Sequence, residues 1–216
     1  MRRKPKRGKE IPFNYPFTQD YEREAFDGLY SGLRIYSSKL TEKVMLEVAS
    51  YCSYHVYEKD AVVLDYGEVC EYVHFTLDGT VTALEKDEGK EHYCWFMTRG
   101  DVVIAIRSYL KQVSSKERLV ALTKYTCISL HVNDLKMLSE KYPEVLLLDL
   151  KCTQHYYLQS FERTKWIRMS ARKKYRMLKM YYPHLTKTEN VTNKALASFL
   201  GICREHLTRI RKEFDK

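Results

Sequence analysis

The hydrophobic pattern divides the chain into a helical start, a middle of short strands and a helical end. From Thr18 to Tyr57, apolar residues recur at spacings of three and four, which predicts short helices with one buried face. From Val62 the period changes to two, as in Val73 to Leu77, which predicts half-buried strands. Turn residues separate the strands at 66–68, 78–79, 87–90 and 99–101. This spacing is typical of an antiparallel sandwich or roll.

A long helix is predicted after the strands. Pro143 suits its first turn, and the helical pattern continues to about Lys165. The helix opens with the apolar run Val145 to Leu148, so it needs cover on two sides. We expect the strand domain on one side and a partner subunit on the other, although burial within one chain is the alternative. The candidate residues for the dimer contact are Leu146, Leu150, Tyr157 and Phe161.

Residues 193–214 have the pattern of a helix-turn-helix. Two short helices that cross need a small residue at their closest approach and a turn residue that tolerates positive φ, which Ala197 and Gly201 supply. They also need apolar facing sides. These are provided by Leu196, Leu200, Ile202, Leu207 and Ile210. An ordinary helical hairpin would share this pattern, so further evidence is needed.

The second helix of this pair, 204–214, carries polar residues suited to DNA. In a helix-turn-helix the second helix enters the major groove, where Arg can bond to guanine and Glu can accept from cytosine. The candidate DNA-binding residues are Arg204, Glu205, His206, Thr208, Arg209 and Lys212. Thr208 and Arg209 could alternatively contact phosphates and only position the helix.

The charge distribution favours the same interpretation. The formal net charge of +9 is uneven: residues 1–10 carry +5, residues 11–162 carry −7 and residues 163–216 carry +11. A basic module on an acidic body favours a polyanion partner, because contacts from Lys and Arg to phosphate release counterions. A solvated basic face is the alternative that charge alone leaves open.

Several other classes of protein lack support in the sequence. The basic N-terminus is not followed by an apolar stretch, and no apolar run is long enough to span a membrane, so we expect a cytoplasmic protein. The six cysteines form no CxxC pair and the histidines no HExxH motif, so no metal site or cofactor is expected. No phosphate-binding loop or GxSxG motif is present. We therefore expect no enzymatic activity.

The segment 191–212 closely resembles the helix-turn-helix of the catabolite-activator/fumarate-nitrate (Crp/Fnr) regulators. In that family an Arg-Glu pair opens the recognition helix and a second Arg follows one turn later. Arg204, Glu205 and Arg209 occupy these places. The resemblance implies that these three residues read the bases of a half-site, and that RNA polymerase is a further partner.

Residues 65–81 likewise resemble the family's cyclic-nucleotide-binding β-roll. The family places a Gly-Glu pair for the ribose shortly after its Gly-Asp turn, and later an Arg-Ser/Thr pair for the cyclic phosphate. Here Ile104-Ala105 takes the first place. Near the second lie Ser114, Ser115, Lys116 and the acidic Glu117, with Arg118 off register. Both departures oppose binding of a cyclic nucleotide. We expect the roll to have lost that ligand, or to bind a different effector at Gly100, Asp101, Ile104, Ala105, Ser115 and Lys116.

A further departure lies at the end of the sequence. Lys216 directly follows the predicted recognition helix, where the family usually adds a small β-hairpin wing. We expect the phosphate contacts of that wing to be absent. DNA affinity would then depend more on dimerisation and on the basic surface around Arg172, Lys173 and Lys174.

These inferences combine into an α+β chain with four parts: a basic flexible tail (1–17), a cyclic-nucleotide-binding-like β-roll sensor with flanking helices (18–142), a dimerisation helix (143–166) and an all-α helix-turn-helix domain (167–216). The resemblance implies a transcription regulator that binds a palindromic operator on double-stranded DNA as a homodimer, with an unknown effector other than cAMP. The alternative is a ligand-sensing or protein-interaction β-roll protein with a vestigial helix-turn-helix.

Overall fold

Two antiparallel sheets form a roll at the centre of the protein. The computed structural model describes residues 7–11, 13, 15–187 and 191–214. One sheet has the order β1-β2-β9-β4-β7 and the other the order β3-β8-β5-β6. The strands are β1 (Lys9–Ile11), β2 (Cys52–Tyr57), β3 (Val62–Leu64), β4 (Tyr72–Asp78), β5 (Val81–Asp87), β6 (Lys90–Met97), β7 (Val102–Val103), β8 (Glu117–Ala121) and β9 (Tyr125–His131). The predicted α+β class with antiparallel sheets is confirmed.

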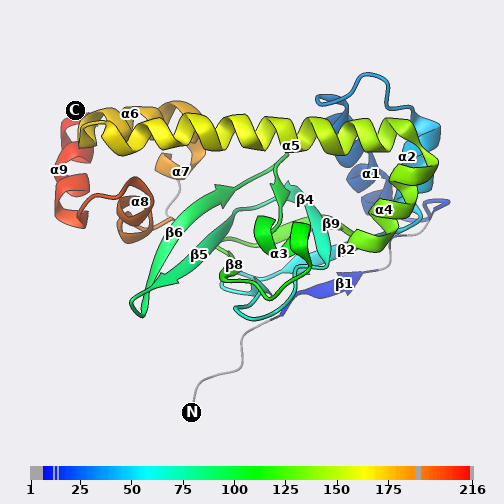
Figure 1. Ribbon diagram of the computed structural model, residues 1–216, viewed down its shortest axis with the longest axis horizontal. Coiled ribbons are helices and arrows are strands. Elements are labelled where there is room, and N and C mark those ends of the chain that lie inside the picture. Colours follow the sequence, from blue (N-terminus) through cyan, green and yellow to red (C-terminus); the bar gives the residue numbers. More distant parts are fainter. Residues whose placement is uncertain (1–6, 12, 14, 188–190, 215–216) are drawn as a thin grey trace, which may run out of the picture.

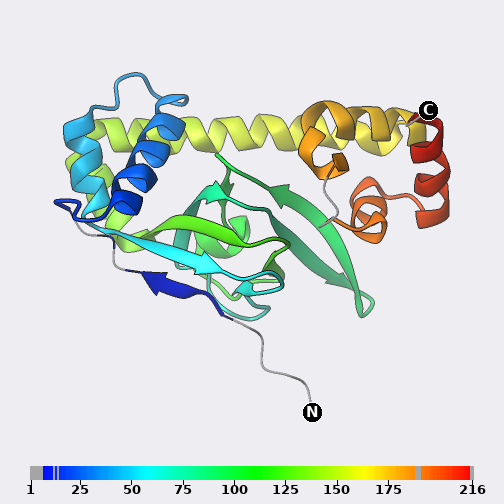
Figure 2. The same ribbon diagram turned by 180° about the vertical axis from the view of Figure 1, so that it is seen from behind.

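Helices lie at both ends of the roll, and one long helix connects them (Figures 1 and 2). At one end are α1 (Asp20–Arg34), α2 (Glu42–Ala49) and α4 (Val132–Lys141); α3 (Ile106–Lys111) lies beside the strands. The long helix is α5 (Pro143–Thr164). At the other end are the 3-10 turn η1 (Lys165–Arg168), α6 (Ala171–Tyr181), α7 (Pro183–Lys187), α8 (Asn193–Leu200) and α9 (Arg204–Phe214).

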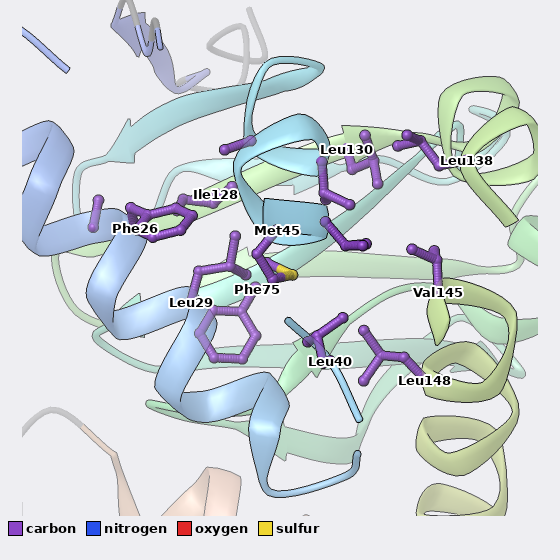
Figure 3. Packing of buried hydrophobic residues seen from close by; sticks show 14 of the residues in the cluster. Phe26, Leu29, Leu40, Met45, Phe75, Ile128, Leu130, Leu138, Val145 and Leu148 are labelled. Carbon is purple, nitrogen blue, oxygen red and sulfur yellow. The ribbon is translucent and has the colours of Figure 1, made fainter. Parts of the chain in front are cut away.

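Alternation along the strands gives each face of the larger sheet its own core. On β4, Phe75 points to a cluster beneath α1, α2 and α5, whereas the neighbouring His74 and Thr76 are buried on the opposite face. Figure 3 shows Met45 and Phe75 in the middle of that cluster, with Leu40 next to them and Leu148 of α5 beyond it on the right. The roll interior and the α6–α9 helices form two further clusters. The sheet therefore anchors α5 through side chains that the strand period selects.

One part of the predicted helical start is wrong. Residues Cys52–Tyr57 form β2, which pairs in register with β9 from Cys52↔Leu130 to Tyr57↔Tyr125. Tyr54 packs against the cluster under the helices, while Tyr57 belongs to the roll interior. A segment covered on both faces, and rich in aromatic side chains, is stabilised as a strand by its cross-strand neighbours rather than by local periodicity.

The description of 1–17 as a flexible tail also needs correction. Residues 9–11 form the edge strand β1, paired with β2, and Phe13 is buried in the cluster under the helices. Arg7 forms an ion pair with Glu68 on the turn before β4. Pairing with a sheet edge supplies hydrogen bonds that charge composition does not reveal. The basic residues at positions 2–6 lie outside the described residues.

Helix α5 has 22 residues, of which Val145 and Leu148 are buried toward the roll. Pro143 occupies its first turn. A proline is tolerated there because the first backbone N–H groups of a helix have no intrahelical acceptor. Within the described ranges, none of the helices combines the length and the hydrophobicity that a membrane-spanning segment needs.

Candidate nucleic-acid interface

Helices α8 and α9 are joined by a turn whose geometry follows from local chemistry. The Thr192 hydroxyl accepts a hydrogen bond from the Ala195 backbone N–H at 3.2 Å and so caps α8. The helix ends at Gly201, whose φ of +61° is accessible to glycine without strain. The backbone N–H of Ile202 then donates to the Ala197 carbonyl at 3.0 Å, and α9 begins two residues later.

The inner faces of the two helices are closely packed. Of the five residues assigned to these faces from the sequence, Leu196, Leu200, Leu207 and Ile210 are buried and Ile202 is half-buried. Ala197, assigned to the closest approach, is also buried. Since a fully packed inner side fixes the orientation of α9, its outer side has a defined set of exposed residues.

The outer face of α9 consists of Arg204, Glu205, Thr208, Arg209 and Lys212, which together line one shallow hollow. Four of them are exposed, and Thr208 is half-buried. Among the described residues, Arg204, Arg209 and Lys212 form no ion pair, although Glu205 lines the same hollow. The Thr208 hydroxyl donates to the Arg204 carbonyl at 3.0 Å, so toward another molecule it can only accept. The sixth candidate, His206, is half-buried beside this face.

Other basic residues of this region hold the helices together. Arg211 donates to the Asn193 side-chain oxygen at 2.6 Å and to the Thr186 carbonyl at 3.1 Å, which ties α9 to α8 and α7. Lys174 donates to the Leu200 carbonyl at the end of α8. Arg172 pairs with Glu213 at 2.8 Å. The basic surface expected around 172–174 is therefore partly used within the chain, and only Lys173 of the three is both exposed and unengaged among the described contacts.

The α8–α9 pair is attached to the roll through β6. The rings of Phe96 on β6 and Phe199 on α8 meet edge to face with 4.9 Å between their centroids. The Tyr93 backbone N–H donates to the Ser198 hydroxyl at 3.0 Å. Edge-to-face aromatic pairs are favourable beyond the area they bury. The sheet and the C-terminal helices thus share one continuous core.

Arg163, near the end of α5, lies at the centre of this junction and was not anticipated from the sequence. Its guanidinium carbon is 3.3 Å from the Phe199 ring centroid and 5.3 Å from that of Trp95 on β6. One terminal nitrogen donates to the Phe199 carbonyl at 2.9 Å, and the other is buried without a partner among the described residues. Burial lowers the pKa of Arg163 to about 10, which still leaves it charged at neutral pH.

The expected effector positions do not converge on one polar pocket. Gly100 adopts a φ of +87° in a tight turn, and the Asp101 carboxylate accepts from the Thr98 backbone N–H at 2.8 Å. The same carboxylate lies 3.5 Å from the Tyr156 hydroxyl, so it faces α5. Burial raises the pKa of Asp101 above its usual value. This turn joins the roll to the long helix.

The remaining effector positions are mostly packed. Ala105 is completely buried in the roll interior, with Ile104 packed against the same cluster. Ser115 is buried, and its hydroxyl donates to the Glu117 carbonyl at 2.9 Å, while Lys116 is exposed. Burial and the facing Glu85 raise the pKa of Glu117 to about 7. Because the Ser115 hydroxyl already donates to a backbone carbonyl, it is not available as a donor to an anionic ligand, and ionised Glu117 would repel one.

A stripe of apolar side chains on α5 faces away from the roll. Leu146, Leu150, Tyr157 and Phe161, the residues expected at a dimer contact, are all at least half exposed, and so is Leu158 between them. Of these, Leu146, Leu150, Tyr157 and Phe161 lie four or seven positions apart in succession and share one side of the helix. Large apolar patches on a surface mark contact sites more often than chance.

Comparison with known proteins identifies the fold. No family model and no curated protein matches the sequence. FixK2 from Bradyrhizobium japonicum has a TM-score of 0.64 at 14% identity, over 76% of this chain and 84% of its own. A Ruegeria pomeroyi protein named for cyclic nucleotide binding has a TM-score of 0.63 at 15% identity, over 88% of both chains. A cyclic nucleotide-binding domain from Methylobacillus flagellatus has a TM-score of 0.59 at 14% identity, over 70% of this chain and 94% of that domain. The predicted cyclic-nucleotide-binding-like roll is confirmed as a fold.

Proposed function

We propose that this protein is a sequence-specific DNA-binding transcription regulator of Crp/Fnr type, with α9 as its recognition helix. The observation that carries the proposal is the outer face of α9. Arg204, Glu205 and Arg209 are exposed there, on a helix whose other side is fixed by the buried Leu207 and Ile210. An exposed Arg-Glu pair at the start of a rigidly held helix suits base edges in the major groove.

The proposal includes a homodimer that forms through α5. A helix of 22 residues is roughly 33 Å long, and its exposed apolar stripe runs from Leu146 to Phe161. Two copies related by a two-fold axis would cover the stripe of each other. They would present two α9 helices to successive major grooves, with half-sites about 34 Å apart. The operator is therefore proposed to be an inverted repeat.

The proposed regulator does not use cAMP as its effector. Ala105 is buried where the Crp/Fnr pattern has a ribose acceptor. Ser115 and Glu117 lie near the place of its Arg-Ser/Thr pair, where ionised Glu117 would oppose the phosphate charge. RNA polymerase is part of the proposal through the resemblance of the sequence alone. No catalytic activity is proposed.

Selection of bound duplexes from a random DNA pool by the full chain tests the proposal. We expect an inverted repeat with half-sites one helical turn apart. Arg204→Ala should relax the preference at one base pair per half-site, whereas Lys212→Ala should weaken all duplexes alike. Retention of no duplex at low salt, or retention without base preference, would refute this function and favour a sensing or interaction role of the roll.

A further inference from the structure

A second hollow lies between the β5–β6 hairpin of the roll and the α8–α9 turn. Lys86, Lys90 and Arg118 line it from the roll, and Lys194 and Arg204 line it from the helices. β6 and α8 are in direct contact, and both lie at the same end of the molecule (Figure 1). We call this hollow the hairpin groove. It combines residues from two parts of the chain that the sequence separates by about a hundred positions.

The hairpin itself has a defined geometry. The last strand pair of the hairpin joins the backbones of Asp87 and Lys90. The two-residue turn between them consists of Glu88 and Gly89, whose φ values are +48° and +78°. Positive φ at both central residues is the pattern of a type I′ turn, which keeps the two strands paired to the tip. Lys86 and Lys90 are therefore held on paired strands close to that tip.

The groove has an excess of unpaired positive charge. Among the described residues that line it, Glu91 supplies the only carboxylate, which already pairs with Arg118 at 3.4 Å. Lys86 lies 4.4 Å from the centre of the Tyr66 ring, and Lys90 has no ion-pair partner among the described residues. The acidic residues at the hairpin tip, 87 and 88, do not line the groove. A concave surface with uncompensated cations attracts a polyanion.

The groove is continuous with the outer face of α9. Arg204 lines both hollows, so the base-contacting end of the proposed recognition helix opens directly into the groove. The phosphates of a DNA strand flank the major groove that such a helix enters. A strand leaving the base edges at Arg204 would thus meet Lys194 and then the hairpin.

We propose that the β5–β6 hairpin is a second DNA contact, in which Lys86 and Lys90 bind backbone phosphates beside the bases read by α9. This inference rests on the proposed function and assigns the roll a part in DNA binding. The contact is independent of sequence, because lysine recognises phosphate as a point charge. It would contribute affinity and orientation without base preference.

Fluorescence anisotropy with the full chain tests the hairpin contact. Binding of the selected operator and of an unrelated duplex is measured from 50 to 200 mM salt for wild type, Lys90→Gln and the double variant Lys86→Gln/Lys90→Gln. Each lost phosphate contact should lower the slope of log affinity against log salt by about 0.9. The deficit of Lys90→Gln should then be roughly three- to fourfold larger at 50 mM than at 200 mM salt, on both duplexes.

Lys136→Gln is the matched control, since it removes an exposed lysine from α4 at the opposite end of the molecule (Figure 1). Hairpin variants that match the control in slope and affinity, while wild type still binds its operator, would overturn the hairpin contact and leave the proposed function intact. A wild-type chain that retains no duplex would instead refute the proposed function. Unchanged melting temperatures of the variants would show that the fold is preserved.

Discussion

Arg209 and Arg211, two residues apart on α9, are predicted to have separate roles. Arg209 is exposed and has no ion-pair partner among the described residues. Arg211 is half-buried and donates two hydrogen bonds, to the Asn193 side chain and to the Thr186 carbonyl. Replacing Arg209 with Ala should therefore affect DNA binding but not stability. Replacing Arg211 with Ala should primarily destabilise the C-terminal helices.

The magnitude follows from the contacts. A hydrogen bond from a charged donor contributes about 1.5–3 kcal/mol, and the two acceptors left by Arg211→Ala are partly accessible to water, which offsets some of the loss. We expect a decrease of about 1–3 kcal/mol in the free energy of unfolding. Arg209→Ala should change it by less than about 0.5 kcal/mol, as is usual for an exposed side chain.

Urea denaturation of the full chain measures this difference. Trp166 is buried in the same cluster as α8 and α9, so its fluorescence should report the loss of their packing. DNA affinity is compared at a temperature where both variants are folded. Equal destabilisation by the two substitutions would refute the assignment, and so would a stable Arg211→Ala variant that has lost DNA binding.

Three further predictions concern the junction, the roll interior and the long helix. Arg163→Met should keep the free energy of unfolding within about 1 kcal/mol of wild type, whereas Arg163→Ala should lower it by about 2–3 kcal/mol in thermal or urea unfolding. The reason is that the packing of this side chain against the aromatic rings contributes more to stability than its charge does. Burial lowers the pKa of His74 to about 3. Below about pH 6.5 the His74 side chain is therefore protonated in the unfolded chain but not in the folded one, so the free energy of unfolding decreases as the pH falls. His74→Gln should remove about 2 kcal/mol of the decrease between pH 7 and pH 5, as measured by urea titrations. Leu150→Glu should weaken self-association about tenfold or more in sedimentation experiments, and Lys151→Glu on the same helix should not.

The sequence predicted best those elements whose ends are set by local chemistry. Pro143 occupies the first turn of α5 and Gly201 ends α8 with a positive φ, both as expected, while Ser170 and Thr192 cap α6 and α8. A cap or a left-handed turn depends on a few neighbouring residues, so its signal is visible in the sequence. β2 was missed for the opposite reason. Its strand pairing depends on β9, about seventy residues further along the chain.

The candidate site shows the same division between local and distant causes. Position along α9 was enough to predict which residues face outward, because helical periodicity assigns the faces. The sequence could not distinguish the basic side chains that remain available to DNA from those already hydrogen-bonded within the chain. Arg211, Lys174 and Arg163 are indistinguishable from their basic neighbours by composition, yet each bonds to a backbone carbonyl of another element.

This division changes how the basic C-terminal quarter should be interpreted. Its net charge alone suggests a uniform polyanion-binding surface, but Arg211, Lys174 and Arg163 stabilise the helices or their attachment to β6. Uncompensated charge is concentrated instead at the outer face of α9 and in the hairpin groove, where Arg204 is common to both. Since counterion release depends on contacts made and not on total charge, the salt dependence of DNA binding should reflect these two surfaces and be weaker than the net charge implies.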